Sequence, residues 1–180
     1  MQISRKMLTD WGACADDLVW FDAHYNEDGA EYQQILNKLA EENKSSCAAW
    51  LLEKAGAQDT IIERYEIVTE NSFFFAGKIK VTNVAQVKFT LLAGGSIEAG
   101  DGINAGDGIN AGECIKAGEC IKAGEGIDAG EFGIFAGLSV RICDWGLRAI
   151  VSAPVKPQNL ISGFFVEKNE DVRNMGKKRD

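Results

Sequence analysis

The sequence predicts an α+β protein in which a small N-terminal helical domain is followed by a β-solenoid. Within the first 58 residues, apolar side chains recur at helical spacing. Residues 97–132 then consist of six consecutive hexads of the pattern Ile-x-Ala-Gly-(Asp/Glu)-x. A short, constant period of this kind is typical of a chain that coils on itself, each rung burying its apolar residues against the next. We therefore expect a helical domain over 1–58, a solenoid over 59–166 and a charged, frayed tail over 167–180.

The helical domain is expected to contain three short helices. Between Arg5 and Tyr25, apolar residues step along the chain by three or four positions, and Gly12 is placed to divide this segment into two helices. A second stripe covers 32–39. Ser45 is a suitable N-cap for the next helix, which Gly56 would end.

From Thr60 onward the composition changes to β-branched and aromatic residues with partial alternation, which is typical of strands. We expect irregular rungs to begin near Ser72, to become regular at Ile97 and to end near Val151. The segment 155–166 is expected to add one or two strands that pack back on the solenoid.

The hexad itself predicts which side chains face the core. In an extended Ile-x-Ala segment, Ile and Ala point inward and x points outward, and every x residue between 98 and 128 is polar. Gly-(Asp/Glu) then forms a corner, for which Gly supplies backbone freedom. A two-sided coil has 12 residues and would stack Asn104, Lys116 and Asp128, whereas a three-sided coil has 18 and would place Glu98 beside Lys116. The sequence permits both, and a narrow prism filled by Ile and Ala favours 18.

Negative charge is concentrated on the repeat. The chain has a net charge of −8, and residues 97–131 contain eight acidic residues and two lysines. This charge disfavours direct binding of nucleic acid or of an anionic membrane. A basic protein or a nucleic-acid-binding complex is the expected partner.

Both possible windings stack corner acids of neighbouring coils. In an 18-residue coil, Asp101 lies over Glu119 and Asp107 over Glu125, while Glu113 lies over Glu131. Like charges at rung spacing destabilise a coil. Two explanations remain open: a corner needs only a polar, turn-compatible residue that duplication copied, or the ridges present charge to a basic partner or a cation. These six acids, together with Trp20 as a possible aromatic anchor, are the candidate partner-binding residues.

No catalytic, cofactor-binding or metal-binding motif is recognisable in the sequence, so no cofactor and no metal are expected. Five cysteines, an odd number without a Cys-x-x-Cys pair, favour reduced thiols and hence a cytoplasmic location. We find no signal peptide at the N-terminus and no apolar run long enough to span a membrane.

The hexads resemble those of the left-handed β-helix, the hexapeptide-repeat class, although Ala and Ile exchange the large and small positions of that pattern. Many members are acyltransferases that need a histidine near the coil, which would make His24, the single histidine, the candidate base. A lone histidine in a helical segment is more typical of packing than of catalysis.

The whole chain also resembles phage and prophage proteins that join a helical start to Gly-Ile-x-Ala-Gly repeats. The resemblance rests on Trp11-Gly-Ala-Cys, on Trp50-Leu-Leu, and on the closing Gly133-Ile-Phe-Ala-Gly-Leu. It implies a mobile-element origin and a bacterial host cell. The leading hypothesis is a non-enzymatic binding protein that inhibits a host defence complex, as anti-CRISPR or anti-restriction proteins do, through its acidic solenoid surface. The alternatives are a hexapeptide-class acyltransferase, and a structural or virion component that self-associates into a homo-oligomer.

Overall fold

The computed structural model describes residues 1–26, 28–130, 133–136, 150–153 and 164–167. The chain divides into two compact units, Met1–Ser139 and Val140–Asp180. In the second unit, β16 (Ile150–Ala153) and β17 (Phe164–Glu167) pair in parallel with each other. The expected irregular end of the solenoid near Val151 therefore falls partly in a separate two-stranded sheet. The expected frayed tail, from residue 168 onward, lies outside the described residues.

The N-terminal region is helical, as predicted, and begins with two short helices. These are α1 (Arg5–Asp10) and α2 (Ala15–His24). Gly12, with φ of +85°, lies between them, so the division at this glycine is confirmed. Ser4 caps α1 by accepting a hydrogen bond from the Met7 N–H over 3.3 Å.

Two longer helices follow a small antiparallel ladder. The ladder joins β1 (Gln2–Ile3) to β2 (Ala30–Glu31), and the helices are α3 (Tyr32–Glu41) and α4 (Ser45–Ala55). The prediction that Ser45 caps the last helix is wrong, because Ser45 is already helical and the N-cap is Lys44. Gly56 ends α4, as expected, with φ of +76°.

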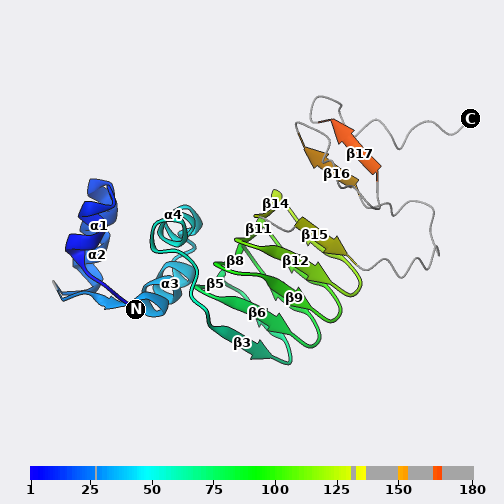
Figure 1. Ribbon diagram of the computed structural model, residues 1–180, viewed down its shortest axis with the longest axis horizontal. Helices are drawn as coiled ribbons and strands as arrows, with labels where there is room; N and C mark the ends of the chain where they lie inside the picture. The colour runs from blue at the N-terminus through cyan, green and yellow to red at the C-terminus, as the bar shows by residue number, and fades with distance from the viewer. Residues whose placement is uncertain (27, 131–132, 137–149, 154–163, 168–180) are drawn as a thin grey trace, which may run out of the picture. The chain divides into compact units, whose positions relative to one another are not determined.

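The solenoid is three-sided, and its strands stack in parallel from coil to coil (Figure 1). Face 1 contains β3 (Ile61–Arg64), β6 (Lys78–Val81), β9 (Ile97–Ala99), β12 (Cys114–Ala117) and β15 (Gly133–Ala136). Face 2 contains β4 (Ile67–Thr69), β7 (Ala85–Val87), β10 (Ile103–Ala105) and β13 (Ile121–Ala123). Face 3 contains β5 (Phe73–Phe75), β8 (Leu91–Ala93), β11 (Gly108–Ala111) and β14 (Gly126–Ala129).

The strand register settles the length of a coil. Ile97 pairs with Ile79 on one side and with Ile115 on the other, so each coil takes 18 residues, the length that the prism argument favoured. The steps at the two ends of face 1 differ: Ile62 pairs with Ile79, and Ile115 with Ile134. The solenoid also begins earlier than expected, because the first coil starts at Ile61 and not near Ser72.

The inward and outward positions of the hexad are confirmed. The isoleucines at 97, 103, 109 and 115 are at most 1% exposed, and the alanines two residues further on are also buried. These side chains and their equivalents in earlier coils form one apolar core along the solenoid axis. Each fully buried isoleucine contributes about 1.5–3 kcal/mol relative to an exposed one.

The helical layer packs on the first two coils of face 3. There the outward position of the strand is apolar: Phe74 and Leu92 are buried in one cluster with residues of all four helices. The equivalent residues of the next two coils, Asn110 and Asp128, are exposed. The helices thus cover part of this face and leave the rest open.

The same layer closes the free edge of β5, the first strand of face 3. The Gln33 side chain donates to the Phe74 carbonyl over 2.8 Å and accepts from the Ala76 N–H over 2.9 Å. The Asn43 carbonyl accepts from both the backbone N–H and the hydroxyl of Ser72, each over 3.0 Å. Two amide side chains therefore take the place of a preceding strand, which protects an edge that would otherwise be available for pairing.

Candidate functional site

The corners of the solenoid hold the predicted acidic residues in register. At the corner between faces 1 and 2, the Glu119 N–H donates to the Asp101 carbonyl over 2.7 Å. At the corner between faces 2 and 3, the Glu125 N–H donates to the Asp107 carbonyl over 2.8 Å. The predicted stacking of acid over acid is therefore confirmed at these two corners, about 4.8 Å apart along the axis.

Glycine precedes each acid for a steric reason and not for the conformational freedom that the sequence analysis assumed. The corner glycines do not have positive φ, which in the described chain is confined to Gly12, Gly29 and Gly56 among the glycines. A Cβ at Gly118 would instead lie 1.7 Å from the Gly100 carbonyl oxygen of the coil before it. Backbone packing between coils thus excludes a side chain here, and the next position becomes the first that can project into solvent.

The third corner, between faces 3 and 1, differs from the other two. Lys78 Nζ lies 3.3 Å from Glu113 Oε2, so this acid is neutralised within the solenoid. Its expected stacking partner, Glu131, lies outside the described residues. The charge that the repeat presents is therefore unequal around the coil.

The unneutralised carboxylates lie on faces 2 and 3 of the third and fourth coils. We call this set the acidic surface; its members are Asp101, Asp107, Glu119, Glu125 and Asp128. Within the described chain, none of the five has a lysine, arginine or histidine nitrogen within 4 Å, and Lys122 is the one basic residue of these two coils on these faces. Faces 2 and 3 meet at the Asp107–Glu125 corner, which is the centre of the surface.

Face 1 has a different charge pattern. Its outward positions are Glu63, Lys80, Glu98 and Lys116, which alternate in sign from coil to coil. Lys80 Nζ lies 3.1 Å from Glu63 Oε1, and Lys116 Nζ lies 3.9 Å from Glu98 Oε1, which confirms the expected neighbours Glu98 and Lys116. A shallow trough of about 500 Å³ runs beside these side chains, along Gly100 and Gly118.

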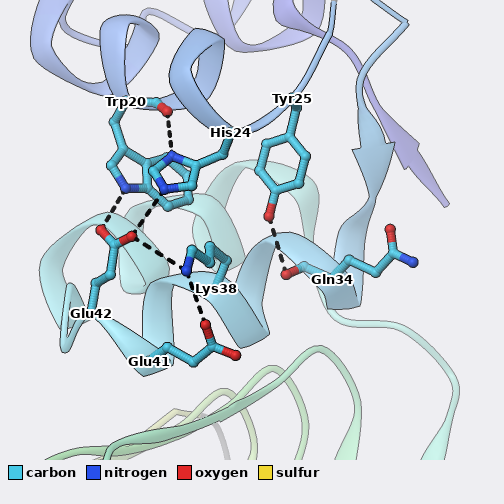
Figure 2. A network of polar contacts seen from close by, with 7 residues as sticks. All are labelled: Trp20, His24, Tyr25, Gln34, Lys38, Glu41 and Glu42. Atoms are coloured by element: carbon cyan, nitrogen blue, oxygen red, sulfur yellow. Dashed lines mark hydrogen bonds and ion pairs between the residues drawn. The ribbon is translucent and has the colours of Figure 1, made fainter.

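Trp20, the aromatic candidate, is half-buried and its polar edge is occupied. Its indole N–H donates to Glu42 Oε2 over 2.7 Å, and His24 Nε2 lies 3.1 Å from the other oxygen of the same carboxylate. Figure 2 shows the two rings stacked above Glu42, at the end of α3, with a centroid separation of 4.7 Å. The residue that was expected to be a free anchor thus joins α2 to α3.

His24 has contacts typical of packing. Its Nδ1 lies 2.8 Å from the Trp20 carbonyl, so both ring nitrogens face oxygen atoms that can only accept. The hydrogen bond from Trp20 is the main cause that lowers the pKa of Glu42, and His24 and Lys38 add to it. Tyr25, beside them, has its pKa raised by burial and then by Glu41 and Glu42 (Figure 2).

The described cysteines are free thiols, and Cys143 lies outside the described residues. Cys14 and Cys47 both donate to Asp17, over 3.0 and 3.2 Å. Burial, followed by the hydrogen bond to Asp17, raises the pKa of Cys47 to about 11. In the described part of the chain, no group of three or more His, Cys, Asp or Glu side chains is arranged to hold a metal ion. No helix there is long and apolar enough to cross a membrane.

These observations define a class: a three-sided parallel β-solenoid whose first coil is closed by an N-terminal helical layer. Residues 1–58, which contain all four helices, match the YdhT N-terminal domain family. Comparison with curated proteins and with solved structures gives no match. The family match thus covers the helical layer, and the solenoid has to be interpreted from its own residues.

Proposed function

We propose that this protein is a non-enzymatic binding protein whose acidic surface binds a basic partner. The observation that carries the proposal is the contrast between corners: Glu113 is neutralised by Lys78, whereas the five carboxylates of the acidic surface have no basic partner among the described residues. Carboxylates stacked at rung spacing repel one another, so a bound cationic surface would relieve a cost that the free protein carries.

The regular backbone supports this proposal. Carboxylates at each of two corners recur about every 4.8 Å along the axis, because coil spacing is set by strand pairing. Phosphates follow one strand of DNA at about 3.4 Å of rise, so the spacing of negative charge is comparable. A protein that binds nucleic acid through a basic groove is therefore a chemically suitable partner. Inhibition of a host defence complex by such charge mimicry, by a protein of phage or prophage origin, is the specific role that we propose.

The test compares two variants of equal charge. The first neutralises four acids of the two stacked corners, as Asn or Gln: Asp101, Asp107, Glu119 and Glu125. The control neutralises four exposed acids outside the solenoid repeat: Asp10, Asp28, Glu53 and Asp59. Immobilised protein is incubated with bacterial lysate at low and at high salt, and retained proteins are identified by mass spectrometry.

We expect the wild type and the control variant to retain the same basic proteins, and the corner variant to lose them. Because surface charges are screened within about 8 Å at physiological ionic strength, retention must also fall at high salt. Retention by the corner variant equal to that by the control would refute the proposed surface.

The acyltransferase alternative depends on His24. Its described contacts are with Trp20 and Glu42, both in the helical layer. A His24→Ala variant that loses acyl-transfer activity while it keeps its fold would support the enzyme and contradict the binding protein.

A further inference from the structure

Face 1 of the solenoid carries a charge pattern that is complementary to itself. Its four outward side chains, which we call the charge column, are Glu63, Lys80, Glu98 and Lys116 in successive coils. All four are exposed, with side-chain exposures between 43% and 68%. The ion pairs along the column hold these side chains in line but leave them accessible to a second molecule.

Consider two copies placed face to face with their solenoid axes antiparallel. The column of one copy then meets the reversed column of the other: Glu63 faces the second copy's Lys116, and Lys80 faces its Glu98. Because the column has four members of alternating sign, every position meets the opposite charge. If the axes are parallel instead, every position meets its own charge, and the contact is repulsive.

From this complementarity we propose that face 1 is the interface of an antiparallel homodimer with two-fold symmetry. The axis passes between the levels of Lys80 and Glu98 and runs parallel to the strands. Such a contact is isologous and closes at two subunits, so it does not propagate into a fibre. Face 1 does not include the acidic surface, so the dimer leaves that surface exposed.

The size of the interface sets the expected strength. Four coils span roughly 14 Å along the axis, so the contact is smaller than the roughly 1,600 Å² buried in stable complexes. Exposed ion pairs also contribute little individually. We therefore expect a weak dimer, formed at high protein concentration and dissociated by salt.

Charge reversal tests the proposal with its own rescue. In Lys80→Glu, residue 80 of each copy meets Glu98 of the other, so two attractive contacts become repulsive. In Glu98→Lys, residue 98 of each copy meets Lys80, with the same result. When the two variants are mixed, all four positions of the heterodimer again meet opposite charges. The expected changes are a loss of self-association of about tenfold or more for each variant alone and recovery in the mixture.

Matched controls carry the same change of charge on other faces. These are Lys122→Glu on face 2 and Asp128→Lys on face 3, both at exposed outward positions. Sedimentation equilibrium at low and high salt measures association of each protein and of the mixture. We expect both controls to dimerise like the wild type. A wild type that stays monomeric at the highest concentration, single variants that dimerise normally, or a mixture without recovery would each overturn the proposal.

Discussion

The substitution Gly106→Ala tests whether backbone contact between coils is the reason for glycine at the corners. A Cβ at Gly106 would lie 1.9 Å from the Lys88 carbonyl oxygen, more than 1 Å closer than real Cβ contacts allow. Since that oxygen belongs to the backbone of the neighbouring coil, no side-chain rotation relieves the overlap. The two coils must separate at this corner.

The cost follows from the contacts that separation weakens. The Gly106 N–H donates to the Val87 carbonyl over 3.2 Å, and the Asp107 N–H donates to the Phe89 carbonyl over 3.0 Å. Each weakened bond costs about 1 kcal/mol. Forcing an extra carbon into a packed site costs about 1–3 kcal/mol. We expect a total of about 3 kcal/mol, which lowers Tm by about 6–12 °C for a chain of this size.

Gly108→Ala is the matched control, because it lies at the same corner and also has no positive φ. A Cβ there would meet its nearest neighbour, the Gly126 carbonyl oxygen, at 3.6 Å, which is an ordinary contact. The change should be neutral or stabilise by about 0.4–1 kcal/mol, since Ala restricts the unfolded chain. Thermal unfolding followed by circular dichroism measures both variants. Equal Tm values for the two would refute the steric explanation.

Three further outcomes are expected. Gln33→Met should lower the free energy of unfolding in urea by about 2–3 kcal/mol, because both edge contacts with β5 are lost; an unchanged midpoint would contradict the capping role. Glu42 has a lowered pKa, so its contribution to stability is present above its usual pKa of 4.5 and is lost as the pH falls through the lower native value. Trp20→Phe removes the largest cause of this shift and should make the acid-induced loss of stability shallower, whereas an identical pH profile would argue against the hydrogen bond. Cys47, with a pKa of about 11, should be alkylated at mildly alkaline pH at least about tenfold more slowly than exposed Cys120; equal rates would show that its thiol is accessible and unshifted.

The hexad was sufficient to predict the inward and outward positions of the repeat, because alternation in a strand is local. It could not by itself determine the number of sides, because six divides both 12 and 18, and the volume of Ile and Ala had to decide. The earlier coils lack the Ile-x-Ala-Gly signature. The step from Ile62 to Ile67 is also one residue short, so the first coil was placed too late.

The docking of the helical layer was not predicted, although a signal was present. Phe74 and Leu92 occupy outward positions where the later coils have Asn110 and Asp128, and an apolar residue there indicates a covered face. The amide of Gln33 gave no comparable signal, because a glutamine on a helix is usually solvated. Trp20 was expected to be exposed because nothing local revealed Glu42 as the acceptor for its indole N–H.

The central claim is that residues 18 apart occupy the same outward column. Nitroxide labels at Asn104 and Lys122, in a variant without other cysteines, test it by electron paramagnetic resonance. These residues are register partners on face 2, so strong dipolar broadening is expected, whereas labels at Asn104 and Lys116 should show little. Broadening of the 104–116 pair without broadening of the 104–122 pair would mean a 12-residue coil and would contradict the three-sided solenoid.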